Sequence, residues 1–148
     1  MTELLIVSLD GVSWDILNTF IDEGRMTNIS QMADSGIDLD LISTVPPDSG
    51  PAWTSFQTGL DPETHEVIDF TRIDENFDTQ ANTLTSVNGS HIWEILNNRG
   101  KEAIPLNLPM LYPAEDQASI AVSGLPAPKI DEASVHPPET LRRLKEQY

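Results

Sequence analysis

Two residues of this sequence, Asp10 and Ser49, are of types that take part in catalysis. Both lie at positions in the sequence where functional side chains are often found. Asp10 ends the apolar segment "LLIVSLD", and Ser49 lies between two prolines in "VPPDSGPAW". A carboxylate can hold a divalent cation, and a hydroxyl becomes a nucleophile when a base or a metal ion activates it. The chain lacks the "GxSxG" pattern of serine hydrolases, which favours activation by a metal. The pair therefore predicts a site with Asp10 as metal ligand and Ser49 as nucleophile.

Each of these residues also has a simpler interpretation, and both interpretations stay open at this point. Asp10 and Gly11 form a common turn dipeptide, and Ser49 could do no more than cap a helix. Pro51 suits the first helical position, so we expect a helix from Pro51 whose free N–H groups and positive dipole end face Ser49. Gly50 would then let a tetrahedral group approach the backbone closely.

The elements that must position these residues alternate between strand and helix patterns. An apolar run predicts a buried first strand at residues 4–7, after which Asp10 stands at the carboxyl end where α/β sheets bind ligands. Helical spacing and caps predict helices over 13–24 and 28–36, then over 90–100 and from 137 onward. Further strands are expected at 37–43, 101–109 and 119–124.

This alternation predicts an α/β fold, a three-layer sandwich around a mostly parallel sheet. We expect residues 1–148 to form one domain, with the polar, Asn- and Asp-rich residues 71–89 as a surface loop or insertion. The last predicted helix has no glycine stop, so we expect the chain to be the front part of an incomplete domain.

Composition limits the partners that the protein can have. Twenty-four acidic residues against eight basic ones give a formal net charge of -16, which argues against nucleic acid and membrane surfaces as direct partners. Dispersed acids with few lysines are typical of a halophile's cytoplasm, although an ordinary acidic protein would look the same. The absence of cysteine leaves carboxylate, hydroxyl and imidazole as metal ligands. The opening "MTELLIVSLD" lacks a signal peptide's basic region, so we expect a cytoplasmic location.

Four segments together resemble a known enzyme family. They are "IVSLDGVSWDIL", "STVPPDSGPAWTSFQTGLDPETHEVIDF", "SHIWEILNNRGKEAIPLNLPMLYP" and "VSGLPAP". They resemble the amino-terminal part of the type I phosphodiesterase/nucleotide pyrophosphatase family, in the alkaline phosphatase superfamily. The resemblance implies an alkaline-phosphatase-like fold, small-molecule phosphate esters as substrates, and two metal ions, usually zinc, with manganese or magnesium as options. It implies that Asp10 and Ser49 bind one metal, and that Ser49 attacks phosphorus to form a covalent intermediate.

Departures from the family pattern restrict these expectations. Ala52 replaces an asparagine that contacts the phosphate in nucleotide pyrophosphatases, which disfavours nucleotide substrates. The family's remaining metal ligands would follow residue 148, so the alternative is a truncated, catalytically silent α/β fragment that could serve as a binding or interaction domain. The exposed strand edge and apolar faces of a truncated sheet would favour self-association. A sulfatase or phosphomutase of the same superfamily is disfavoured, because a sulfatase motif needs an arginine that "SGPAW" lacks.

Three histidines and three tryptophans are further candidates for the site. We expect a structural role for His65, a solvent-facing position for His91 and no role for His136. The tryptophans are expected to be packing residues, except that Trp53, four residues after Ser49, could wall the site.

Overall fold

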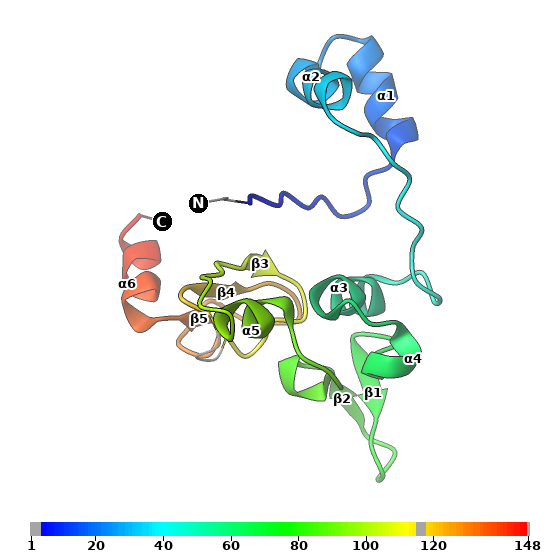
Figure 1. Cartoon of the computed structure of the whole chain (residues 1–148). Helices are drawn as coiled ribbons and strands as arrows, with labels where there is room; N and C mark the ends of the chain where they lie inside the picture. The colour runs from blue at the N-terminus through cyan, green and yellow to red at the C-terminus, as the bar shows by residue number, and fades with distance from the viewer. Residues whose placement is uncertain (1–3, 115–117, 148) are drawn as a thin grey trace. The chain divides into compact units, whose positions relative to one another are not determined.

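The computed structural model describes residues 4–114 and 118–147 and separates into two compact units, residues 1–42 and 43–148. Unit 1 holds helices α1 (Trp14–Asp22) and α2 (Thr27–Ser35) (Figure 1). As predicted, Ser13 is the N-cap of α1, and the chain turns away soon after its end at Gly24, where φ is 70°. Helix α2 begins earlier than expected, with Met26 at the N-cap, and Gly36 ends it as predicted.

The two strands predicted in unit 1 do not form among the described residues. Residues 4–9 and 37–43 are assigned to no strand, and their apolar side chains are exposed, as in Leu5 at 86% and Leu41 at 95%. The prediction of a buried first strand is therefore wrong for unit 1 as described. An apolar run indicates a preference for burial, but a strand also needs a neighbour that accepts its backbone hydrogen bonds.

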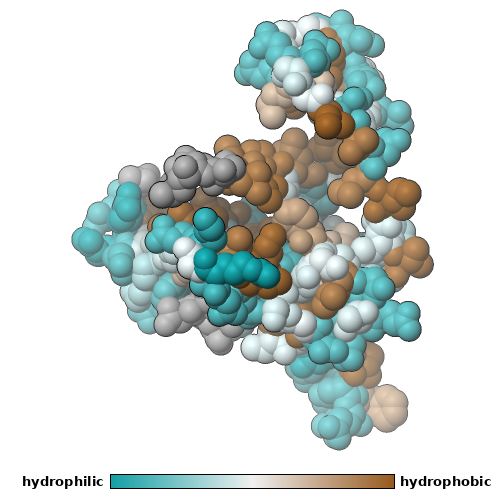
Figure 2. Space-filling model, in the orientation of Figure 1, coloured by the Kyte–Doolittle hydropathy of each residue, from teal (hydrophilic) through white to brown (hydrophobic). Residues whose placement is uncertain are grey.

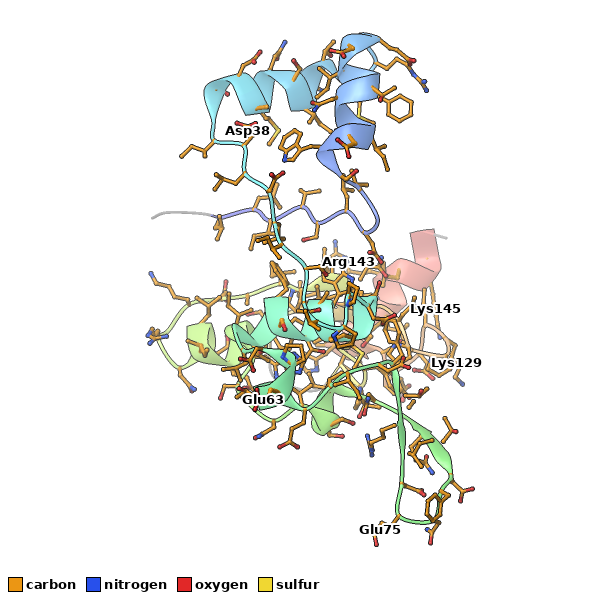
Figure 3. The ribbon with its side chains drawn as sticks, turned by 90° about the vertical axis from the view of Figure 1, so that its right-hand side faces the viewer. Asp38, Glu63, Glu75, Lys129, Arg143 and Lys145 are labelled. Atoms are coloured by element: carbon orange, nitrogen blue, oxygen red, sulfur yellow. The ribbon has the colours of Figure 1, made fainter. Side chains whose placement is uncertain are left out.

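Unit 2 begins with two helices and a β-hairpin. Helices α3 (Ser49–Thr58) and α4 (Pro62–His65) precede strands β1 (Thr71–Ile73) and β2 (Thr79–Ala81), and a 3₁₀ turn, η1 (Leu84–Ser86), follows. Strands β1 and β2 pair antiparallel, with Arg72 opposite Gln80. Residues 71–89, expected to be a surface loop or insertion, thus contain an exposed hairpin with Glu75 at its tip (Figure 3).

The second sheet of unit 2 has the order β3-β4-β5. Strands β3 (Leu106–Leu108) and β4 (Ala121–Ser123) are parallel, whereas β4 and β5 (Val135–His136) are antiparallel. The mixed α/β class is therefore confirmed. A three-layer sandwich around a mostly parallel sheet is not formed by the described residues, because two of their three strand pairs are antiparallel.

The core of unit 2 gathers around Trp93 on helix α5 (Ile92–Asn97), whose side chain is 1% exposed. It packs with Ala121 of β4 and with four further buried residues, Leu84, Leu111, Ala114 and Ala118. Helix α6 (Pro138–Gln147), the last described element, contacts β5. Among the helices that the structure describes, none combines the length and the apolar character needed to cross a bilayer.

Candidate functional site

Ser49 is the first residue of α3, and Asp48 is the N-cap. The Asp48 carboxylate accepts a hydrogen bond from the Gly50 N–H at 3.1 Å, which is the usual way to satisfy a free amide of the first turn. The helix thus starts two residues before Pro51, and the capping interpretation of Ser49 is wrong. Pro51 at the third position costs no helical bond, because the first four N–H groups have no partner inside the helix. The half-buried Ser49 is held in the amino-terminal turn.

Gly50 has a different role from the one expected. A Cβ at this position would lie 2.9 Å from the Asp69 carbonyl carbon and 3.0 Å from the Phe70 nitrogen. These separations are too short for a side chain, so the glycine lets α3 pack directly on the Asp69–Phe70 peptide. The space beside the Gly50 Cα is therefore filled by this chain's own backbone, and the expected approach of a tetrahedral group does not use it.

His65 joins α4 to the middle of α3. Its side chain is fully buried, with Nε2 2.9 Å from the Ser55 Oγ. The Val67 N–H donates to Nδ1 at 3.1 Å, so the neutral ring carries its hydrogen on Nε2 and donates it to Ser55. In this state His65 cannot take a proton from Ser55, although the two side chains resemble a serine–histidine catalytic pair. Burial lowers the pKa of His65, and these bonds agree with the structural role predicted for it.

A second anchor connects α3 with the end of β3. The buried Gln57 donates from Nε2 to the Pro109 carbonyl oxygen at 2.5 Å. Trp53 lies on the same helix, half-buried, and makes an edge-to-face contact with Phe56 at 5.9 Å between ring centroids. The helix that carries Ser49 is thus fixed along its length by side chains on several turns.

An open hollow of about 640 Å³ lies on the α4 side of α3. Its lining residues are Thr44, Val45, Ser55, Gly59, Leu60, Asp61, Pro62 and Glu63. Glu63 projects from α4 (Figure 3). Neither Ser49 nor Trp53 lines this hollow, so it is a feature separate from the predicted nucleophile.

Asp10 lies in unit 1, exposed, at a turn in which Gly11 has a φ of 67°. The two predicted site residues therefore belong to different units. In the described part of the chain, no three or more His, Asp or Glu side chains group closely enough to hold a metal ion. One carboxylate and one hydroxyl are fewer donors than the four that zinc usually takes, so these residues alone do not make a complete metal site.

His91 departs from its prediction. It is the N-cap of α5 and only 3% exposed, not solvent-facing, and its ring stacks on Trp93 with 4.6 Å between centroids. Neither ring nitrogen has a hydrogen-bond partner among the described residues. Burial lowers the pKa of His91, and the nearby Glu94 carboxylate, 3.9 Å away, opposes that shift only in part. The prediction failed because the helix starts one residue later than expected, which turns the ring toward Trp93.

The described residues thus form a mixed α/β protein in which a half-buried serine lies in the first turn of an anchored helix. The model of the family described as type I phosphodiesterase / nucleotide pyrophosphatase matches residues 4–147, and the chain belongs to this family. The match corresponds to the amino-terminal portion of a family member, as the resemblance implied. Members are metal-dependent hydrolases of phosphate esters within the alkaline phosphatase superfamily. Searches of curated proteins and of solved structures gave no match.

Proposed function

We propose that this protein hydrolyses small phosphate esters with Ser49 as the nucleophile. The observation that carries the proposal is the position of Ser49 in the capped first turn of α3, in a chain matched to the family over residues 4–147. In the first step the Ser49 Oγ bonds to phosphorus while the bond to the leaving alcohol breaks, and the serine proton ends on that alcohol. Water then cleaves the phosphoserine and restores the hydroxyl.

Asp10 and Ser49 are proposed as two ligands of the metal site that the family uses. Two zinc ions are the first choice, and manganese or magnesium also suits oxygen donors. A bound cation would supply Lewis-acid stabilisation of charge on the phosphoryl oxygens. Further ligands are needed beyond these two, since the described residues contain no group of three or more His, Asp or Glu that could hold a metal ion.

Ala52 supports simple esters over nucleotide pyrophosphates as substrates. It is half-buried on α3, one turn after Ser49, and its methyl group has no atom that could bond a phosphate oxygen. Family members that take nucleotides carry an asparagine at the matching position, which can donate to the phosphate.

The test is hydrolysis of bis-p-nitrophenyl phosphate by the purified chain, with added zinc or manganese at high salt. Ser49→Ala is expected to lower kcat by about a thousandfold or more, as removal of a nucleophile does in other hydrolases. Ser90→Ala, which changes an exposed serine outside α3, is the control and should retain activity. A phosphorylated Ser49 peptide trapped at low pH would support the covalent step. A folded chain without turnover would contradict the proposal and favour the catalytically silent alternative.

A further inference from the structure

We propose that Asn82 is a positioning residue for Ser49, acting through the base of the β1–β2 hairpin. The inference rests on the proposed function only in taking Ser49 as the nucleophile. We call the group formed by the Asp69–Phe70 peptide, Arg72 and Asn82 the hairpin brace. Its members lie at the base of the hairpin and are joined by hydrogen bonds, and the Asp69–Phe70 peptide contacts Gly50 in the first turn of α3.

The first link of the brace is the packing of Gly50 on the Asp69–Phe70 peptide. A Cβ on Gly50 would meet three backbone atoms of that peptide at 2.9 to 3.3 Å, so the two backbones are in direct contact. Ser49 precedes Gly50, so movement of the peptide would move the hydroxyl with it. No flexible side chain lies between them to absorb the shift.

The second link is the hold of Asn82 on the same peptide. Asn82 is 3% exposed; its side-chain Nδ2 donates to the Asp69 carbonyl at 2.9 Å, and its backbone N–H donates to the Phe70 carbonyl at 2.7 Å. Two bonds from one residue to consecutive carbonyl groups fix both the place and the tilt of the peptide. The carbonyl of Asp69 that Asn82 holds belongs to the peptide group against which Gly50 packs.

The third link sets the orientation of the Asn82 amide. Arg72 donates to the Asn82 Oδ1 at 3.1 Å and also to the Ser86 Oγ. A guanidinium has donors only, so Oδ1 must face Arg72, and Nδ2 is left to face the Asp69 carbonyl. The hairpin brings Arg72 and Asn82 together, because its turn reverses the chain between them. This gives the exposed hairpin a role in the site even though its tip is distant in sequence from Ser49.

The experiment compares Asn82→Asp with Gln80→Glu. Both variants replace an amide by a carboxylate on the same arm of the hairpin. Gln80 pairs with Arg72 across the ladder, but its exposed side chain donates to Asp74 and does not bond Asn82 or the Asp69–Phe70 peptide. An aspartate at 82 cannot donate to the Asp69 carbonyl and places two oxygens against each other. We expect kcat on bis-p-nitrophenyl phosphate to fall about tenfold or more, with KM changed less than about threefold, since misplaced reacting groups cost rate rather than binding. Gln80→Glu should match the parent protein.

A second readout does not require activity. Amide hydrogen exchange of Gly50 and residues 52–54 is expected to quicken about tenfold in Asn82→Asp, while exchange in β3 and β4 stays as in the parent. If Asn82→Asp does not fold, Arg72→Met tests the same connection from an exposed residue and should give a smaller change, about twofold to tenfold, in the same direction.

The outcomes separate this inference from the proposed function. Unchanged exchange at residues 50–54 in a folded Asn82→Asp variant would overturn the brace, whatever the activity. An inactive parent chain would instead contradict the role of Ser49. The exchange comparison would still decide whether the hairpin brace stabilises the first turn of α3.

Discussion

The two buried histidines of unit 2 differ in the hydrogen bonding of their ring nitrogens. Both ring nitrogens of His65 have partners, the Ser55 hydroxyl and the Val67 amide. The ring nitrogens of His91 have no such partners among the described residues; the ring stacks on Trp93, and its Nδ1 lies 3.9 Å from the Glu94 carboxylate. Protonation of His91 would place a charge in a buried site that the Glu94 carboxylate, 3.9 Å from Nδ1, stabilises only in part.

The lowered pKa of His91 predicts that this residue makes the stability of the protein depend on pH. Its pKa in the folded protein is below the ordinary 6.5, so the unfolded chain binds more protons as pH falls through 6.5. The stability that the folded protein gains from a neutral His91 is fully present above pH 6.5. It is lost as the pH falls toward the lowered pKa of His91. We expect His91→Phe, which keeps an aromatic ring on Trp93, to lose less stability than the parent between about pH 7.5 and pH 5.5 in urea unfolding.

Other titrating groups do not produce this difference. His65 shifts in the same direction but is present in both proteins, so it cancels in the comparison. The pKa values of Asp61, Asp74 and Asp131 are lowered from 3.8, so they titrate below the measured range. Equal losses of stability in the parent and in His91→Phe would contradict the prediction.

At the scale of elements, α3 is held by its cap as well as by side chains farther along it. Asp48 accepts from the Gly50 N–H, and its carbonyl accepts from the Ala52 N–H at 3.0 Å. The carboxylate also places negative charge at the positive end of the helix dipole. The cap and the hairpin brace thus act on the same turn from different sides.

Removal of this cap should cost measurable stability. Asp48→Ala leaves the Gly50 amide without its side-chain partner, and we expect a loss of about 1 kcal/mol in the free energy of unfolding. Asp48→Asn, which keeps an oxygen acceptor, is the matched control and should lose less than half as much. Urea unfolding followed by circular dichroism measures both, and equal losses would mean that the hydrogen bond is not the source.

Helices were predicted better than strands, because their signals are local. Ser13 and Gly24 bound α1 as expected, since caps act within a few residues of the sequence. Residues 4–9 and 37–43 have strand-like patterns, but pairing depends on distant partners that a pattern does not specify. The hairpin was missed because its strands are three residues long and exposed, so they show no alternation of apolar and polar residues.

Only the part of the candidate site that has a local sequence signal was predicted. Ser49 was recognised from the prolines and glycine around it, which mark a helix start within a short stretch of chain. Asn82 lies 33 residues later in a polar segment (82 − 49 = 33), and nothing in its local sequence indicates burial. Its importance arises from tertiary contact with Asp69 and Phe70, which only the fold brings next to α3.

The whole molecule combines strong negative charge with exposed apolar side chains. Apolar residues appear among polar ones on the visible surface (Figure 2), and Leu4, Leu5, Ile37, Leu41 and Ile42 are among the most exposed. Charge repulsion between copies opposes association, whereas burial of these side chains favours it. The balance between the two depends on salt, since screening weakens only the repulsion.

Self-association should therefore increase with ionic strength. Raising KCl from about 0.1 M to about 1 M shortens the screening length from about 10 Å to about 3 Å. We expect the weight-average mass in sedimentation velocity to rise over this range, and Leu5→Gln combined with Leu41→Gln to reduce the rise. Ile130→Gln, an exposed apolar residue of unit 2, is the control. A mass independent of salt would show that the exposed segments do not drive association.

The close packing of Gly50 also limits how this sequence can vary over evolution. Residues 69 and 70 contribute only backbone atoms to the contact, but the Asp69 carboxylate also accepts from the Phe70 N–H, so Phe70 can vary more freely than Asp69. The glycine has no such freedom, because any substitution would meet the Asp69 carbonyl carbon at 2.9 Å. A saturation library should thus accept many residues at 70 and fewer at 69, while returning only glycine at 50.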